Sequence, residues 1–183
     1  MEIDFYSINM QKCLHLAREL HLRGFEQLRV FPHVSPSGTA WRCDFESEKY
    51  GENIAVSLDL PKQAIIQTSN FIGHMLEYAA EKKLKSILLL GHLGKLVKVA
   101  AGNFHTHSKI SDARLETLAA YSALLGMEQR GIEMIFNCTT TEAAMPIIDE
   151  YQLGNKLYPL LCKRASIRSM QHVYNDLTVG TIV

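Results

Sequence analysis

The sequence predicts an α/β fold, a parallel or mixed sheet flanked by helices, with a small helix-hairpin element at the N-terminus. The strand-like run Ser86-Ile87-Leu88-Leu89-Leu90 is apolar on both faces, as in a buried parallel strand. Helical segments alternate with short strand candidates after residue 53. The length of 183 residues allows one core and at most a small appended element.

The N-terminal element is expected to span residues 1–48. Apolar side chains recur at helical spacing over residues 8–23, and the next residue is a glycine. Residues 27–31 and 39–45 are strand candidates, joined by a segment rich in proline and serine that favours a turn. The polar, acidic stretch that follows marks a boundary, so residues 49–183 are predicted to form the α/β domain.

Helices and strands alternate through the predicted α/β domain. Caps support several of the helices: Thr68, Ser69 and Asn70 precede the first, Ser111 precedes the second, and Thr139 with Glu142 forms a capping box. The predicted strands are 54–58, 64–67, 86–90 and 178–183; the predicted helices are 71–83, 111–125, 128–137 with an interruption at Gly131, one that opens near Thr139, and 155–174 with Pro159 in its first turn.

Composition narrows the class of protein. No apolar run approaches the roughly 18 residues that span a bilayer, and the first residues lack the features of a signal peptide, so we expect a cytoplasmic protein that binds no membrane. The 19 basic and 19 acidic residues cancel, which argues against binding to nucleic acid. The cysteines are far apart and predict reduced thiols: Cys13, Cys43, Cys138 and Cys162.

The strongest local feature is a block of positive charge over residues 82–111. It contains six lysines and no acidic residue, although the whole chain is electrically balanced. Such one-sided placement indicates that an anionic ligand binds here, and it predicts one basic concave surface. The lysines are Lys82, Lys83, Lys85, Lys95, Lys98 and Lys109.

The block contains a candidate anion-binding turn directly after the predicted strand. Gly91 and Gly94 permit close approach by a ligand, and the turn leads into a helix whose first N–H groups favour negative charge. Lys95 and Lys98 are placed to bind carboxylate or phosphate groups. The spacing matches no nucleotide-binding fingerprint, so a tight turn beside a solvated lysine face remains an alternative.

Histidines form a second candidate group. His105 and His107 point to the same side if their segment is extended, which suits hydrogen bonding to a substrate or proton handling. His92 lies in the glycine turn and is a further candidate. A metal site needs a third ligand that nothing in the sequence places nearby, so no metal is expected. A polar surface loop is the alternative.

Three weaker candidates complete the predicted site. Ser69 and Asn70 either cap a helix or hold a ligand. Asp112 lies at the expected start of a helix, where a negative charge stabilises the helix dipole whether or not it contacts a ligand.

Several of these segments, taken in order, resemble the C-terminal half of the cobalt-precorrin-5B C1-methyltransferase (CbiD) family. The resemblance covers about residues 49–183 and is strongest up to residue 123. The segments that carry it are Thr68-Ser69-Asn70-Phe71-Ile72-Gly73, Gly91-His92-Leu93-Gly94-Lys95-Leu96-Val97-Lys98-Val99-Ala100-Ala101-Gly102, Thr106-His107-Ser108 and Asp112-Ala113-Arg114.

The resemblance implies an enzyme, a C-methyltransferase of anaerobic cobalamin biosynthesis. A shortened family member would transfer a methyl group from S-adenosyl-L-methionine to C1 of a cobalt-precorrin, an anionic tetrapyrrole rich in carboxylates. His92, His105 and His107 are then the catalytic candidates, and the substrate-binding candidates are Lys95, Lys98, Gly91, Gly94, Ser69, Asn70 and Asp112.

Family members have a longer N-terminal domain than residues 1–48 provide, which leaves a second interpretation. In it the chain is a non-catalytic module, derived from that family, that binds a tetrapyrrole or another anion. The loop that holds the cofactor and the presence of a homo-oligomer are not determined by the sequence.

Overall fold

The computed structural model of the chain describes residue 68 and residues 70–183. The predicted N-terminal helix and hairpin, the strands at 54–58 and 64–67, the boundary near residue 48 and Ser69 all lie outside these residues. They stay predictions.

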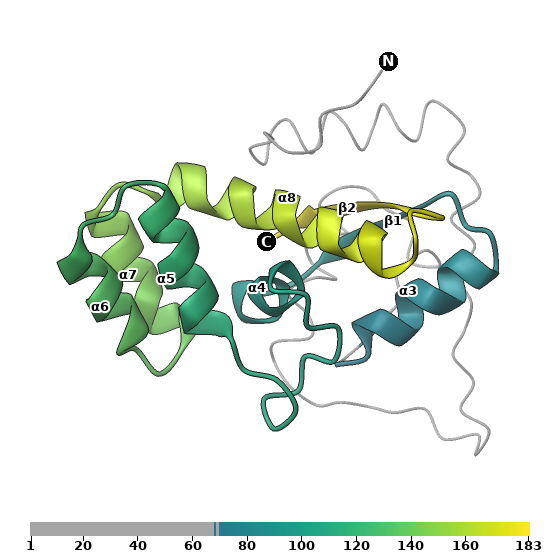
Figure 1. The fold of residues 1–183 in the computed structure, drawn as a ribbon, viewed down its shortest axis with the longest axis horizontal. Coiled ribbons are helices and arrows are strands. Elements are labelled where there is room, and N and C mark those ends of the chain that lie inside the picture. Colours follow the sequence, from purple (N-terminus) through teal and green to yellow (C-terminus); the bar gives the residue numbers. More distant parts are fainter. Residues whose placement is uncertain (1–67, 69) are drawn as a thin grey trace.

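The described part contains six helices and two strands (Figure 1). In chain order they are α3 (Ile72–Glu81), β1 (Ser86–Leu90), α4 (Leu93–Ala100), α5 (Arg114–Leu124), α6 (Gln129–Phe136), α7 (Thr141–Glu150), α8 (Gly154–His172) and β2 (Thr178–Ile182). This arrangement confirms the α/β fold.

The sheet of the described residues is a parallel pair of strands. β1 pairs with β2 in a register that runs from Ser86 opposite Thr178 to Leu90 opposite Ile182. Parallel strands require a crossover connection, and here five helices fill it. Both strands therefore end on the same side, next to the start of α4.

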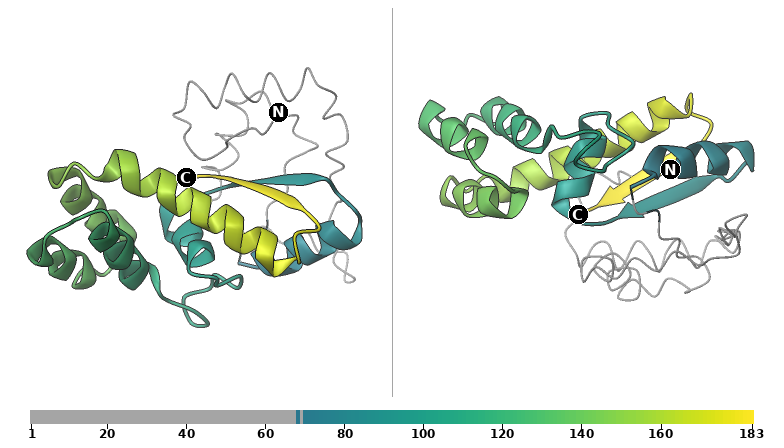
Figure 2. Two further views of the ribbon diagram at one scale, coloured as in Figure 1. Left: turned by 45° about the horizontal axis from the view of Figure 1, so that its top comes forward. Right: turned by 90° about the horizontal axis from the view of Figure 1, so that it is seen from below.

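Helix α8 connects the two parts of the fold. In Figure 1 its first half lies beside α5 and α7, and its second half runs along the strands. Figure 2 shows α3 and α8 on the same face of the strands. The buried Ser166 hydroxyl donates to the Thr181 hydroxyl at 2.9 Å, which joins α8 to β2.

Helix α4 lies at the centre of the core. Five of its apolar side chains are buried, and the helix packs against α8, α5 and α7. A helix that is apolar around most of its circumference is stable only when neighbours cover it on several sides. The position of α4 therefore fixes where its first turn points. The buried apolar residues are Leu93, Leu96, Val97, Val99 and Ala100.

Several predicted helix starts are shifted by one to three residues. Helix α7 is capped by Thr140, whose Oγ1 accepts from Ala143 N at 3.1 Å, one residue beyond the expected cap. Helix α5 begins at Arg114, and the Ser111 hydroxyl donates instead to the His105 carbonyl. Pro159 lies in the second turn of α8 rather than in its first.

Two further predictions about helices also differ from the structure. The first helix is not capped by Thr68 or Asn70, because its N-cap is Phe71 and no side chain caps it. Gly131 does not interrupt α6; it is buried within the helix against Tyr151. Among the described residues, no helix is both long and apolar enough to cross a membrane.

We predict that Gly131→Ala destabilises the protein by about 1–3 kcal/mol, as overpacking of a core does. A Cβ at this position would lie 2.7 Å from Tyr151 Cζ and 2.9 Å from Met127 Cγ, so the α6–α7 contact must shift. Urea unfolding measures the change. Gly91→Ala is the matched control, because its Cβ would meet only Leu96 atoms at 3.9 Å. Equal stability of the two variants would contradict the prediction.

Candidate functional site

The candidate site lies where the first turns of α4, α5 and α7 meet, close to the end of β1. A Cβ placed on Gly94 would lie 3.0 Å from Thr141 Oγ1 and 3.9 Å from Arg114 Cδ. These three residues belong to the three different helices. Because the first turn of a helix carries positive potential, three of them together favour negative charge.

The first turn of α4 offers backbone donors. Its N-cap, His92, has an extended backbone, and no side chain caps the helix. Gly94 lies so close to Thr141 that a larger residue would displace the start of α7. Thus the predicted glycine turn does lead from a parallel strand into a helix, and Gly94 is needed for close packing between helices.

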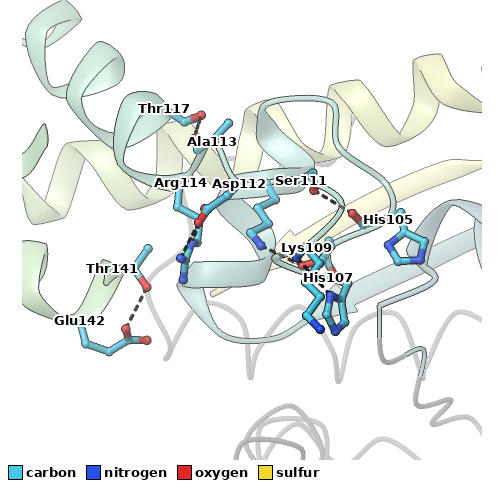
Figure 3. Close-up of polar contacts among 12 residues, drawn as sticks. His105, His107, Lys109, Ser111, Asp112, Ala113, Arg114, Thr117, Thr141 and Glu142 are labelled. Atoms are coloured by element: carbon cyan, nitrogen blue, oxygen red, sulfur yellow. Dashed lines mark hydrogen bonds and ion pairs between the residues drawn. The ribbon is translucent and has the colours of Figure 1, made fainter. Parts of the chain in front are cut away.

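An ion pair marks the start of α5. Arg114 Nε donates to Asp112 Oδ1 at 2.7 Å, and a terminal nitrogen of Arg114 donates to Asp112 Oδ2 at 2.9 Å (Figure 3). This two-point contact lowers the pKa of Asp112. Asp112 lies before the helix and not in its first turn, so its main partner is the guanidinium.

Glu142 adds an acidic group from α7. Its carboxylate accepts from the Thr141 hydroxyl at 3.1 Å (Figure 3). Hydrogen bonding from its own backbone N–H, and then from the Thr141 and Thr140 hydroxyls, lowers the pKa of Glu142, and the nearby His92 contributes to the same effect. The site therefore holds charges of both signs.

Lys98 lies in the interior. Its side chain is 3% exposed, and Nζ donates to the Thr106 carbonyl at 2.9 Å. Thr106 in turn contacts Asn70, through Oγ1 to Oδ1 at 3.3 Å and through its N–H to the Asn70 carbonyl at 2.9 Å. Burial lowers the pKa of Lys98, and the positive charge of Arg114 adds to the effect. This geometry favours a structural role over contact with a substrate.

The two histidines of the 103–111 loop are not equivalent. His105 is half-buried, and its ring meets Phe71 edge-on with 4.9 Å between ring centroids. His107 is exposed, and its Nδ1 accepts from the Lys109 N–H at 3.2 Å. Among residues 68 and 70–183, no three His, Cys, Asp or Glu side chains come together as a metal site would require.

The lysine block does not form a single surface, and this expectation was wrong. Lys82, Lys83 and Lys85 precede β1, whereas the other three lysines follow it. A strand of five residues separates the two groups by about 13–16 Å. In addition, Lys82 is paired with Glu81 at 3.0 Å. The half-buried Lys95 is the remaining lysine on the first turn of α4.

Sequence reasoning did not assign Arg114, Thr106, Thr141 or Glu142 to the site. The fold brings Arg114, Thr141 and Glu142 to the predicted glycine turn from segments up to about 50 positions away, whereas Thr106 contacts Lys98 and Asn70. The available signal was the run Asp112-Ala113-Arg114, where an acid and a base lie two residues apart, but it was not interpreted as an ion pair. Helical spacing alone gave no indication that α7 would pack against α4.

A comparison with known protein families finds a match that includes part of the candidate site. Residues 105–183 match the family described as CbiD, C-terminal domain. The matched segment begins in the loop that Lys98 supports and continues to β2.

Three curated relatives share the same protein name. The chain is 47% identical over 133 residues to a cobalt-precorrin-5B C(1)-methyltransferase of Desulfitobacterium hafniense, which covers 72% of this chain and 34% of the relative. It is 45% identical over 134 residues to the protein of that name from Moorella thermoacetica, covering 73% and 34%. It is 46% identical over 123 residues to the protein of that name from Salmonella arizonae, which covers 67% of this chain and 32% of the relative.

The chain thus spans about a third of the length of these curated relatives. No solved structure matches it.

We predict that Lys98→Met destabilises the protein by about 1–3 kcal/mol, because the Thr106 carbonyl loses its donor while the apolar stem is kept. Lys95→Met is the matched control on the same helix and should leave stability unchanged or slightly raised, since a lysine in a first turn opposes the helix dipole. Urea unfolding measures both. If the two substitutions change the free energy of unfolding equally, the structural role of Lys98 is contradicted.

We predict that the stabilising effect of Asp112 depends on pH. The folded pKa lies below the ordinary 3.8, so the unfolded chain takes up the proton first. The contribution is present above pH 3.8 and disappears as pH falls through the folded pKa. The stability difference between wild type and Asp112→Asn, measured by denaturation at several pH values, should shrink accordingly. The difference should be small at every pH in an Arg114→Gln background; a pH dependence that survives there would contradict the assignment.

Proposed function

We propose that the chain takes part in C1-methylation of a cobalt-precorrin in cobalamin biosynthesis, with S-adenosyl-L-methionine as the methyl donor. The observation that carries the proposal is identity of 45–47% to relatives named as this methyltransferase. The separate match to the CbiD C-terminal domain covers residues 105–183, which include Arg114, Thr141 and Glu142 of the candidate site. Residues 49–183 are proposed as the domain that provides this site.

The charge of the site suits an anionic tetrapyrrole. The macrocycle carries acetate and propionate groups, which the uncapped N–H groups of α4 and the ammonium of Lys95 can bind. Gly91 keeps the approach to these donors free of a side chain, and Gly94 shapes the site by allowing α4 to pack closely against Thr141. Lys98 and Asn70 act less directly, because both are hydrogen-bonded to Thr106 and hold the loop that carries His105 and His107.

The site also offers a partner for the methionine part of the cofactor. Its ammonium suits the carboxylate of Glu142, which hydrogen bonds keep ionised. When bound, S-adenosyl-L-methionine supplies a methyl group on a positively charged sulfur. The residues of the site would orient the acceptor carbon towards that group, because alignment contributes more than a strong base to such a transfer.

We assign proton handling to the histidines. His92 lies at the N-cap of α4 beside Glu142, where a carboxylate can orient its ring. His107 is exposed and available to a substrate, whereas His105 is packed against Phe71. Asp112 acts through Arg114, which it holds at the edge of the site. Ser69 stays a candidate for ligand contact.

A non-catalytic module that binds a tetrapyrrole or another anion is the second candidate function. The chain matches only about a third of each relative. If methyl transfer requires the rest of those proteins, the matched part alone would bind a ligand without turnover. The anion-binding features described above serve either function. Transfer of the methyl group distinguishes the enzyme from the non-catalytic module.

The test has two stages on the purified chain. Calorimetry should show binding of S-adenosyl-L-methionine, and incubation with a cobalt-precorrin and donor labelled in the methyl group should transfer the label to C1. Lys95→Ala should weaken binding of the precorrin about tenfold or more, since loss of a charged hydrogen bond of roughly 1.5–3 kcal/mol exceeds one decade. Precorrin binding without label transfer supports the module, and absence of binding to either ligand refutes both functions.

A further inference from the structure

Helix α8 carries positive charge that the proposed methyltransferase site does not use. From Gly154 to His172 the helix contains five basic residues and no acidic residue. They are Lys156, Lys163, Arg164, Arg168 and His172. Lys156 and Lys163 are exposed, but Arg164 and Arg168 are half-buried. Half-buried positive charge without an acid on the same helix favours a partner from elsewhere.

The two arginines lie on one face of the helix. They are four residues apart, so one stands above the other on the same side. Ser166 contacts β2, and Arg164, two residues earlier, is turned about 200° around the helix from it. The arginine face is thus directed away from β2.

Loop residues after α4 border this face. A Cβ on Gly102 would lie 3.9 Å from Arg168 Nε, and Gly102 itself has φ +92, a conformation that only glycine adopts readily. One turn further along α8, the ring of His172 stacks on Phe104 with 4.0 Å between centroids. His172 also lies 3.0 Å from Glu77. His172, the last basic residue of α8, therefore has an acidic partner. Arg164 and Arg168 have no such partner among the described residues.

Neither arginine is satisfied within the described residues. Nε of Arg164 and Nε of Arg168 are buried without a hydrogen-bond partner there, and no ion pair of either residue occurs in that part of the chain. Two like charges one turn apart repel each other. The end of α4 beside Gly102 favours a positive charge at Arg168 through the helix dipole, but this does not satisfy its Nε–H or explain Arg164.

The terminal nitrogens of both guanidinium groups have a different environment. They are not among the enclosed unpartnered atoms of the described residues, so part of their surface faces solvent. Guanidinium groups bind the oxygens of carboxylates and phosphates through pairs of parallel hydrogen bonds. A single anionic group between the two side chains would relieve their repulsion and supply acceptors.

We propose that Arg164 and Arg168 form a binding subsite for an oxyanion, a carboxylate or a phosphate group, on the face of α8 turned away from β2. The subsite is separate from the first turns of α4, α5 and α7, and it does not depend on methyl transfer. A carboxylate bound there belongs to a polycarboxylate ligand; a phosphate belongs to a nucleotide or to free phosphate.

The test uses the full chain, with inorganic phosphate and citrate as probes in separate calorimetric titrations. At least one probe should bind, and Arg164→Gln/Arg168→Gln should weaken that binding about tenfold or more, the loss expected when charged hydrogen bonds are removed. Lys156→Gln/Lys163→Gln is the matched control, because it removes the same charge from exposed positions of the same helix. Its affinity should equal that of wild type. Phosphate binding without citrate binding identifies the phosphate source, and the reverse identifies the carboxylate source.

A second measurement does not depend on the variants. The probe that binds should raise the thermal midpoint of the wild-type chain above its value in chloride of the same ionic strength, since a ligand that binds only the folded state stabilises it. Arg164→Gln/Arg168→Gln should be at least as stable as wild type without ligand, because it removes two repelling charges. The proposal is overturned if neither probe binds wild type, or if the two double variants lose affinity equally.

Discussion

The parallel pairing of β1 with β2 is the constraint on which the described structure depends. A parallel pair cannot be closed by a tight turn, so the chain must leave one end of the sheet and return to the other. Helices α4 to α8 make this return, and α8 brings it back along the strands. Because β1 leads directly into α4, the first turn of α4 is fixed at the edge of the sheet. The starts of α5 and α7 then meet it through packing around Gly94.

The positions of the segments before α3 and after α4 depend on one buried ammonium group. Lys98 reaches from the centre of the core to the Thr106 carbonyl, and Thr106 links to Asn70 before α3. Three separate segments are therefore held by neighbouring hydrogen bonds that water does not reach easily. The arrangement explains how the long connection between α4 and α5 keeps its histidines in fixed positions although it contains no helix or strand.

Much of this fold could be predicted from periodicity and from caps, and the failures have physical causes. Strands 86–90 and 178–182 and most helices follow from apolar patterns, because burial of one face requires such patterns. The block of six lysines was misinterpreted although a strand was predicted within it, because that strand carries the two halves of the block to opposite ends and packing turns Lys98 into the core. Lys98 was assigned to a ligand because it follows the predicted glycine turn, yet its ammonium is buried and donates to a backbone carbonyl. The meeting of Arg114 and Glu142 depends on helix packing, which no local pattern encodes.

The connection between β1 and β2 also has a consequence for the order in which the protein folds. Helices α5, α6 and α7 contact one another over short stretches of chain, whereas the sheet joins segments that lie 92 positions apart at Ser86 and Thr178. Contacts between distant segments form slowly, because the chain must first close a long loop. The helical cluster can thus form early, but the strand edge beside α4 is complete only after β2 has docked. During synthesis the candidate site is one of the last parts of the described structure to reach its final shape.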